Sequence, residues 1–341
     1  MPGGFEKELS VALEAVRSAA RVCQSVQSKI TPDVLEKDDR SPVTVADFAS
    51  QAVICRAIGA AFPGDPIIGE EESSTLSRGE NAPFLDRILA ELRGVGVETC
   101  GKEACAWIDR ASQKEYVPRF WTLDPIDGTK GFLRKEQYAI SLALIVEGRI
   151  QVALLGCPNL PCEPGGTRIG TLFYAIRGGG SWAIPLEGDG ARRSIHASQE
   201  SDPRQARFCE SVESAHTAQG LSAKVAALLG ITREPLRLDS QAKYAVVARG
   251  EAEIYLRLPA KFGYKEKIWD HAGGVLLVEE AGGCVCDVMG QPLEFNHGYE
   301  LLANRGIVAA NRPLHPRVLS ALHEIYAKFP PPQAPPVVPT A

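Results

Sequence analysis

The sequence predicts an α/β protein whose helices and strands pack as layers. One observation is that helix-like and strand-like segments alternate evenly through the second half of the chain, a pattern typical of α/β sandwiches. A second is an amphipathic helix over residues 5–27, with apolar residues at spacings of three and four. A third is the apolar strand 120–123, which runs directly into a turn rich in Pro, Gly and Asp.

The first half of the chain predicts a mixed α+β domain, residues 1–185. After the first helix, a second helix runs to about Phe62, where Pro63-Gly64-Asp65-Pro66 ends it. A short buried strand follows at residues 66–69, and then a helix at 83–93. The stretch 90–119 otherwise matches no pattern. Beyond the central turn, strands are expected at 138–146, 150–155 and 170–176, the first two as a hairpin.

The polar stretch 185–205 predicts a domain boundary, followed by an α/β domain over residues 186–328. The expected strands of this domain cover residues 206–209, 236–238, 253–258, 284–288 and 306–310. Its expected helices cover residues 217–229, 241–249, 270–281 and 313–328. Residues 329–341 are Pro-rich, and we expect an extended, disordered tail there.

Composition narrows the class of function. The chain has 341 residues, of which 45% are hydrophobic and 23% charged, as in an ordinary globular protein. Its net charge is −5 and its basic residues are scattered, so we expect no nucleic-acid polymer as partner. It shows no secretory leader and no membrane-length apolar run, and its nine cysteines lack zinc spacing. These features predict a cytoplasmic, monomeric enzyme with reduced thiols and no membrane partner.

The turn after the central strand carries the clearest chemical signal. Asp124 and Asp127 leave the end of an apolar strand, and Pro125 between them fixes the backbone. Gly128 allows the backbone to approach a ligand, and Thr129 stands where a helix could begin with unpaired amides. Carboxylates beside such amides suit a divalent cation that meets a phosphate. Taken alone, however, the same residues also describe a capped turn.

Three further acidic positions are candidates. Asp47 lies in the first turns of the second helix, where a carboxylate also simply suits the helix dipole. Glu70, Glu71 and Glu72 follow a buried strand, and such a cluster needs either solvent or a cation. Glu70 is nearest the sheet and is therefore the preferred ligand. Asp270 opens a predicted helix, which fits both an N-cap and a metal ligand.

These positions stand in order along the chain within blocks that resemble a known superfamily. The blocks are Asp47, Gly69-Glu70-Glu71, Asp124-Pro125-Ile126-Asp127-Gly128-Thr129 and Trp269-Asp270-His271-Ala272-Gly273-Gly274. They resemble the lithium-sensitive, magnesium-dependent phosphatases of the inositol monophosphatase superfamily, over roughly residues 5–325. Within it the chain is most similar to 3′(2′),5′-bisphosphate nucleotidases, through residues 41–47, 128–134, 238–244 and 255–259. The resemblance implies a layered αβαβα sandwich. One departure is the extra Glu in the acidic cluster.

The resemblance also implies a set of metal ligands and a mechanism. Glu70, Asp124 and the carbonyl of Ile126 would hold one Mg²⁺, while Asp124, Asp127 and Asp270 would hold a second, and a third ion is expected near Glu70. Asp47 and Thr129 would form the catalytic dyad that orients a metal-activated water and takes its proton. The water would attack phosphorus directly, without a covalent enzyme intermediate.

The implied substrate is a small nucleotide. Substrate contacts are carried over to Gly128, Thr129, His216, Ser240, Lys243, Arg257 and Asp270. Lys and Arg at these positions could form charge-assisted hydrogen bonds with a second phosphate of the substrate. A single Lys or Arg, however, is more often simply a surface residue. We expect release of the 3′-phosphate of adenosine 3′,5′-bisphosphate, giving AMP and phosphate, with the 5′-phosphosulfate analogue as a further substrate. An inositol phosphatase with the same metal site, and a non-catalytic nucleotide or cation sensor, are the alternatives.

Overall fold

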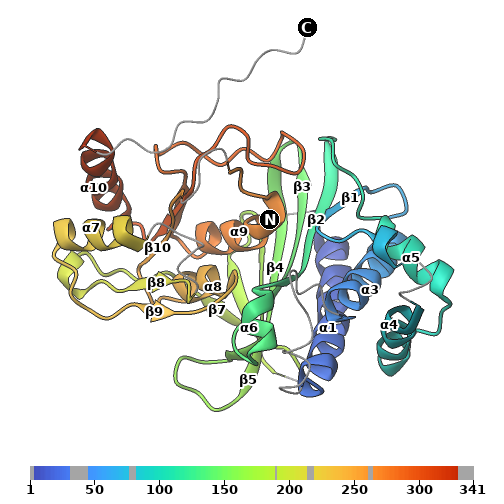
Figure 1. Cartoon of the computed structure of the whole chain (residues 1–341). Helices are drawn as coiled ribbons and strands as arrows, with labels where there is room; N and C mark the ends of the chain where they lie inside the picture. Colours follow the sequence, from blue (N-terminus) through green and yellow to red (C-terminus); the bar gives the residue numbers. More distant parts are fainter. Residues whose placement is uncertain are drawn as a thin grey trace, which may run out of the picture.

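The computed structural model describes residues 4–30, 45–76, 82–188, 190–212, 219–259 and 264–328 (Figure 1). In this part of the chain, helices and two β-sheets stack as the predicted αβαβα sandwich. Helices α1 (Glu6–Ser28) and α3 (Val45–Ala61) form one outer layer against the first sheet. Helices α8 (Ala242–Ala248) and α9 (Ala272–Glu280) lie between the sheets, and α7 (Gln219–Leu229) and α10 (His315–Lys328) form the other outer layer.

The first sheet has seven strands in sequence order. They are β1 (Ile67–Gly69), β2 (Arg119–Asp127), β3 (Ala139–Val146), β4 (Arg149–Pro161), β5 (Ile169–Ile176), β6 (Ser181–Pro185) and β7 (Arg193–Ile195). Strand β1 runs parallel to β2, and every later neighbour pair is antiparallel. One pair of strands therefore ends at the same edge of the sheet, which matters for the site described below.

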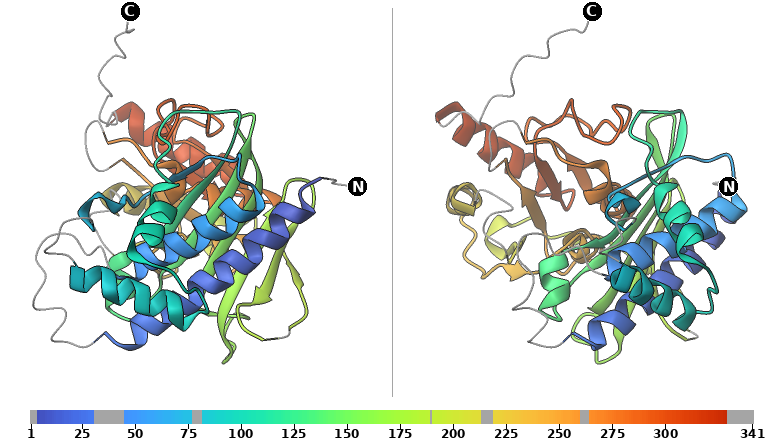
Figure 2. Two further views of the ribbon diagram at one scale, coloured as in Figure 1. Left: turned by 90° about the vertical axis from the view of Figure 1, so that its right-hand side faces the viewer. Right: turned by 45° about the vertical axis from the view of Figure 1, so that its right-hand side comes forward.

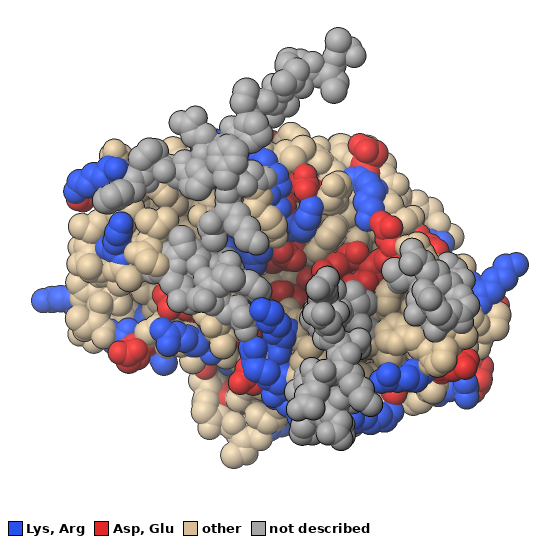
Figure 3. Space-filling model, in the orientation of Figure 1, with Lys and Arg blue, Asp and Glu red and all other residues tan. Residues whose placement is uncertain are grey.

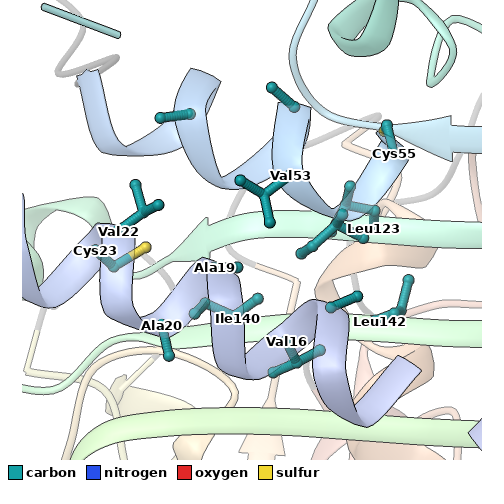
Figure 4. Packing of buried hydrophobic residues seen from close by; sticks show 14 of the residues in the cluster. Val16, Ala19, Ala20, Val22, Cys23, Val53, Cys55, Leu123, Ile140 and Leu142 are labelled. Carbon is teal, nitrogen blue, oxygen red and sulfur yellow. The ribbon is translucent and has the colours of Figure 1, made fainter. Parts of the chain in front are cut away.

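Small residues allow the first outer layer to pack closely. Helix α1 buries Ala12, Ala15, Ala19 and Ala20 together with larger apolar residues. Figure 4 shows Val16, Ala19, Val22 and Cys23 of α1 among Val53 of α3 and Leu123, Ile140 and Leu142 of the sheet. Because these side chains are removed from water on every side, they contribute the hydrophobic stabilisation of this half. Helices α4 (Ala82–Gly94), α5 (Gly101–Asp109) and α6 (Thr129–Leu133) complete it.

The middle layer is buried on both faces, which explains its uniformly apolar sequence. In α9, residues 272–278 are all buried between the two sheets (Figure 2). The two glycines of this helix leave room for its neighbours: a Cβ on Gly273 would lie 2.4 Å from Ser141 Oγ. A Cβ on Gly274 would lie 2.2 Å from the ring of Tyr244 in α8. The glycines of the Trp-Asp block therefore serve helix packing.

The second sheet is mixed and has the strand order β11-β12-β10-β8-β9. Its strands are β8 (Phe208–Glu210), β9 (Leu236–Arg237), β10 (Ile254–Arg257), β11 (Cys284–Cys286) and β12 (Ile307–Ala310). Strand β10 pairs parallel with β8 and antiparallel with β12. Short 3₁₀ segments are η1 (Ser73–Thr75), η3 (Pro203–Gln205) and η5 (Ile268–Asp270).

The structure differs from the sequence prediction in several places. Helix α5 lies in the stretch that showed no pattern, because nine residues offer too few apolar repeats to detect. Strand β7 pairs with β6 and so extends the first sheet beyond residue 185; the division into domains 1–185 and 186–328 stays a prediction. Asp270 ends η5 rather than opening α9, whose N-cap is His271.

The remaining features concern a glycine turn, the cysteines, membrane-spanning helices and the predicted segments that lie outside the described residues. The glycine run 178–180 is a turn whose amides at Gly178 and Gly180 donate to the Glu280 carboxylate, at 2.8 and 2.9 Å. All nine cysteines are free. Among the described residues, the structure has no helix with the length and apolar character needed to cross a bilayer. The segment 41–44, His216 and the Pro-rich tail 329–341 lie outside the described residues.

Candidate active site

The site begins where β1 and β2 end. These strands are parallel, with Gly69 opposite Leu123, so the next residues, Glu70 and Asp124, leave the sheet side by side. The carboxyl ends of parallel strands lie at one edge of a sheet, which brings the two carboxylates together although they are far apart in sequence. The acidic cluster and the central turn thus belong to one site.

The turn itself has the predicted backbone. The pairing of β2 with β3 shifts register between Asp124 and Asp127, so the strand bulges there. The amide of Ile126 donates to Asp124 Oδ1 at 3.1 Å. Gly128 has φ of +87°, a left-handed conformation that favours glycine, and it is the N-cap residue of α6. The Thr129 hydroxyl donates to the carbonyl of Ile126 at 3.4 Å.

The second half of the chain supplies the opposite wall. The carbonyl of Trp269 accepts hydrogen bonds from Gln241 Nε2 at 2.9 Å and from Ser141 Oγ at 3.3 Å. Asp270 follows directly and reaches the same pocket as Glu70 and Asp124. The backbone amide of Gln241 also donates to Asp127 Oδ2 at 2.6 Å, which joins the two walls.

Most of the predicted site residues line one cleft of about 210 Å³. They are Glu70, Asp124, Ile126, Asp127, Gly128, Thr129, Ser240, Lys243, Arg257 and Asp270. In Figure 3, Asp and Glu side chains gather in a hollow near the centre of the molecular face, with Lys and Arg beside them. The structure therefore brings together residues from four distant stretches of the chain.

Asp47 lies beside this cleft rather than in its lining. Its side chain is buried in the first turn of α3, and its charge raises the pKa of both Glu71 and Asp124. One turn further along the same helix, Ser50 Oγ donates to the carbonyl of Pro125 at 3.1 Å. Helix α3 is thereby fastened to the turn after β2, and Asp47 is held close to the carboxylates of that turn.

The acidic side chains of the cleft repel one another, and the pKa values of Glu70, Asp124 and Asp270 are raised. Burial, followed by the charges of Glu70 and Asp127, holds the pKa of Asp124 well above its usual range. Burial and Asp270 raise the pKa of Glu70, although this side chain is exposed to water that screens part of the repulsion. Burial also raises the pKa of Asp270 to about 6, even though Arg257 opposes the shift.

This donor set fits a hard cation. Carboxylate and carbonyl oxygens converge without sulfur or imidazole nitrogen at the turn, as Mg²⁺ requires. A cation among them would restore ionisation of the carboxylates whose pKa values are raised. A second group, Glu266, Asp270 and His271, also has ligand atoms within 4.8 Å of one another. Arg257 contacts both carboxylates of that group, so it already has a cation.

Arg257 is enclosed by acids at the end of β10. Its Nε lies 2.7 Å from Glu266 Oε2, and its Nη2 donates to Asp270 Oδ2 at 3.3 Å. Burial lowers the pKa of Arg257, but these carboxylates more than offset that effect. Conversely, burial raises the pKa of Glu266, while Arg257 and a hydrogen bond from His271 outweigh it and hold the pKa at about 2. The two side chains therefore form a stable ion pair.

Lys243 and Ser240 form the floor near Asp127. Lys243 is buried, and its Nζ donates to the carbonyl of Ser240 at 2.7 Å and to that of Leu238 at 3.2 Å. Burial lowers the pKa of Lys243, while the charge of Asp127 opposes the shift. Ser240 has φ of +69°, an uncommon conformation for a residue with a side chain. It brings Ser240 against Gly128, where an added Cβ would lie 2.9 Å from Ser240 Cβ.

Sequence reasoning missed several residues of the site. Gln241 stood inside a recognised block but was given no role, although its amide contacts Asp127. Gln51 exchanges hydrogen bonds with the backbone of Glu71, donating at 2.6 Å and accepting at 3.2 Å. The position of Gln51, one turn after Asp47 on α3, was the signal that could have identified it. Glu266 lies in a polar stretch without periodicity, so the sequence offered no signal for it.

Comparison with known proteins identifies relatives that match almost the whole chain. The model of the inositol monophosphatase family matches residues 6–327. A 3′(2′),5′-bisphosphate nucleotidase of Schizosaccharomyces pombe is 42% identical over 346 residues, covering 96% of this chain and 98% of that protein. A protein of the same name from Emericella nidulans is 44% identical over 350 residues, covering 94% of this chain and 99% of its own.

Solved structures share the fold at lower identity. An inositol monophosphatase from Anabaena superposes with a TM-score of 0.62 at 22% identity, covering 98% of each chain. An inositol monophosphatase from Zymomonas mobilis has a TM-score of 0.62 at 20% identity, covering 94% of this chain and 99% of its own. The family model spans nearly the whole chain and the relatives exceed 40% identity, so this chain belongs to the inositol monophosphatase family.

Proposed function

We propose that this chain is a Mg²⁺-dependent phosphomonoester hydrolase that removes the 3′-phosphate of adenosine 3′,5′-bisphosphate, yielding AMP and inorganic phosphate. The single observation that carries the proposal is one cleft lined both by the acids of the central turn and by Ser240, Lys243 and Arg257. The acids suit a metal-dependent phosphatase, and the basic residues suit a substrate with a second phosphate. The names of the full-length relatives support the same activity.

The proposed metal ligands are those of the turn and its neighbours. Glu70, Asp124 and the Ile126 carbonyl hold one ion, and Asp124, Asp127 and Asp270 hold another. Two or three Mg²⁺ per site are expected. When bound, the ions lower the pKa of water and screen the charge of the phosphoryl oxygens. The raised pKa values of Asp124 and Asp270 support a site in which bound cations would offset the repulsion between the carboxylates.

The residues of the chain position and deprotonate the attacking water. Asp47 and Thr129 act as the dyad that orients this water and accepts its proton. The buried position of Asp47 beside Asp124, and of Thr129 at the start of α6, supports this role. The amides after Gly128 hold the phosphoryl oxygens, since the first N–H groups of a helix lack partners within it. Attack on phosphorus then breaks its bond to the ribose 3′-oxygen.

Substrate recognition falls to the second wall of the cleft. Ser240, Lys243 and Arg257, together with His216, are the proposed nucleotide contacts, and Gly128, Thr129 and Asp270 complete the set. Arg257 is the strongest candidate for the second phosphate, because its planar guanidinium can donate two parallel hydrogen bonds. The 5′-phosphosulfate analogue is a further proposed substrate, since it carries the same 3′-phosphate.

The test measures phosphate release from adenosine 3′,5′-bisphosphate and from inositol 1,4-bisphosphate, with Mg²⁺ and with a chelator. The proposal expects Mg²⁺-dependent release with a kcat/KM at least tenfold higher for the nucleotide. A higher kcat/KM for the inositol phosphate would indicate instead that the chain is an inositol phosphatase. Absence of release from both substrates in the presence of Mg²⁺ would contradict any catalytic function.

A further inference from the structure

Arg257 stands at one end of a continuous line of buried polar side chains. Its Nε lies 2.7 Å from Glu266 Oε2. The same carboxylate oxygen lies 3.1 Å from His271 Nε2, and His271 Nδ1 lies 2.8 Å from Tyr244 Oη. The line runs from the cleft into the interior between the two sheets, because both Tyr244 and His271 are fully buried.

For a neutral His271 ring, the hydrogen-bond partners fix the direction of each proton in this line. An ionised Glu266 can only accept, so His271 Nε2 carries the proton that it donates. In the neutral ring, Nδ1 is then an acceptor, and the Tyr244 hydroxyl donates to it. The chain of donors is therefore Tyr244 to His271 to Glu266, with Arg257 as the cation that faces the carboxylate.

Such a line is costly in an apolar core. Tyr244 and His271 are surrounded by the buried cluster that includes Ala245, Ala272 and Tyr255. Buried polar groups destabilise a fold unless each has its partner, and apolar residues of similar volume would serve packing equally well. The line of Tyr244, His271 and Glu266 ends on Arg257, which lines the cleft, so its effect on Arg257 best explains why it is there.

The geometry restricts Arg257 to one orientation. Glu266 holds the Nε edge of the guanidinium, and Asp270 accepts from Nη2 at 3.3 Å. Arg257 lines the cleft, and the N–H groups of its guanidinium that do not face these acids can donate to a ligand there. A free Arg side chain would lose rotamer freedom when it binds a ligand, which weakens binding. Arg257 is already ordered in the folded protein, so it avoids that entropic cost.

We propose that Glu266, supported by His271 and Tyr244, is a positioning residue that orients Arg257 toward the second phosphate of a bisphosphate substrate. It thereby determines the preference for bisphosphates over monophosphates. This inference rests on the proposed function, and specifically on Arg257 as a phosphate contact. A role in folding alone would instead affect all substrates equally.

The experiment compares two substrates that differ by one phosphate. We would measure kcat and KM for adenosine 3′,5′-bisphosphate and for adenosine 3′-monophosphate with the full chain and Mg²⁺. In Glu266→Gln, the KM for the bisphosphate should rise about tenfold to a hundredfold, because the ion pair that holds Arg257 is lost, with a much smaller change in kcat. The ratio of kcat/KM between bisphosphate and monophosphate should fall by a similar factor.

A matched control begins at Lys267, the residue that follows Glu266 in the sequence. Lys267 Nζ pairs with Glu300 Oε1 at 2.5 Å, and both side chains are partly buried, with relative exposures of 28% and 24%. Neither residue lines the cleft. Glu300→Gln therefore removes a comparable ion pair and should leave the substrate ratio unchanged. A change of the ratio as large as that in Glu266→Gln would contradict the proposal.

A double-mutant cycle identifies the route of the effect. In an Arg257→Met background, adding Glu266→Gln should lower the substrate ratio by less than twofold further, because its target is already absent. Independent, multiplying losses would overturn the proposal, and so would an equal loss on both substrates in Glu266→Gln. If Glu266→Gln does not fold, Tyr244→Phe gives the same readout through the far end of the line. Failure of the wild type to hydrolyse the bisphosphate would refute the proposed function instead.

Discussion

At the scale of single residues, the site depends on carboxylates whose charges are in conflict. Asp124 is at the centre, because its pKa is raised by burial and by the charges of Glu70, Asp127, Asp270 and Asp47. Such a cluster destabilises the folded chain unless a cation neutralises it. The same residues therefore lower stability without metal and create affinity for it.

Replacing Asp124 separates these two effects. Asp124→Asn should raise the Tm of the protein in a chelator, because it removes one of the repelling charges. Since the folded-state pKa of Asp124 lies above that of an unfolded carboxyl, ionisation costs stability as the pH rises, so the advantage of Asn should grow with pH. Thermal unfolding at pH 5 and pH 8, with and without Mg²⁺, checks this. A lower Tm than wild type in the chelator would contradict it.

Asp47 offers a test of the general base. Asp47→Asn keeps the shape of the side chain but cannot accept a proton, so kcat should fall about a hundredfold or more while KM stays within a fewfold. Steady-state kinetics on adenosine 3′,5′-bisphosphate measures both. The control is Glu72→Gln, an exposed acid paired with Lys114 at 2.8 Å outside the cleft, whose turnover should stay at the wild-type level. A kcat near that of the wild type in Asp47→Asn would contradict the assignment of Asp47 as the general base.

At the scale of elements, the catalytic turn depends on backbone conformations that only particular residues adopt. Gly128 combines a φ of +87° with close contact to Ser240. On the neighbouring edge, Gln51 of α3 holds the backbone of Glu71 through both the nitrogen and the oxygen of its side-chain amide. The turn and the acidic loop are thus positioned by hydrogen bonds and contacts that contribute no charge of their own.

Gly128→Ala tests this contact against a suitable control. Gly165 has a φ of +70° and nothing within 4 Å of an added Cβ, so Gly165→Ala carries the conformational cost alone, about 1–2 kcal/mol. Gly128→Ala carries that cost and also a Cβ 2.9 Å from Ser240 Cβ. We expect kcat/KM to fall at least tenfold in Gly128→Ala and to stay unchanged in Gly165→Ala. Equal kinetics in the two variants would show that the contact with Ser240 is unimportant.

At the scale of the whole molecule, the cleft lies between the two sheets and needs both walls in register. Arg134, which follows α6, donates to Asp239 at 2.5 Å, and Asp239 is almost fully buried. Gln241 donates to Asp127 at 2.6 Å in the same interface. These bonds link the turn after β2 to Ser240 and to the start of α8, which carries Lys243.

Breaking the ion pair should loosen this interface. Arg134→Gln removes the ion pair that the buried Asp239 makes with Arg134, and Arg134 is partly exposed, so we expect a cost of about 1–2 kcal/mol. Thermal unfolding should show a Tm lower by several degrees, with a higher KM for the nucleotide. Arg134→Gln combined with Asp239→Asn should recover part of the Tm. Arg204→Gln, in an exposed pair with Asp202, is the control and should change neither quantity.

The element pattern was predictable where local signals are strong. The helices of residues 5–27 and 313–328 were confirmed within a few residues, and so was the hairpin after the turn, except that its second strand runs on to Pro161. Acids at strand ends, such as Glu70 and Asp124, were also predictable, because a buried strand that breaks into carboxylates directs them to a sheet edge. Helix α5 was missed because its nine residues show too short a pattern.

The sequence by itself determined which chemistry is available: the paired acids of the central turn, the glycine beside them and the family to which the blocks belong. The tertiary structure alone decided which groups meet. The amide of Gln241 contacts Asp127, and Glu266 with His271 holds Arg257, across 114 residues in the first case. The physical reason is that secondary structure follows from local periodicity, whereas a contact between distant segments depends on how the layers pack and leaves no periodic signal in the chain.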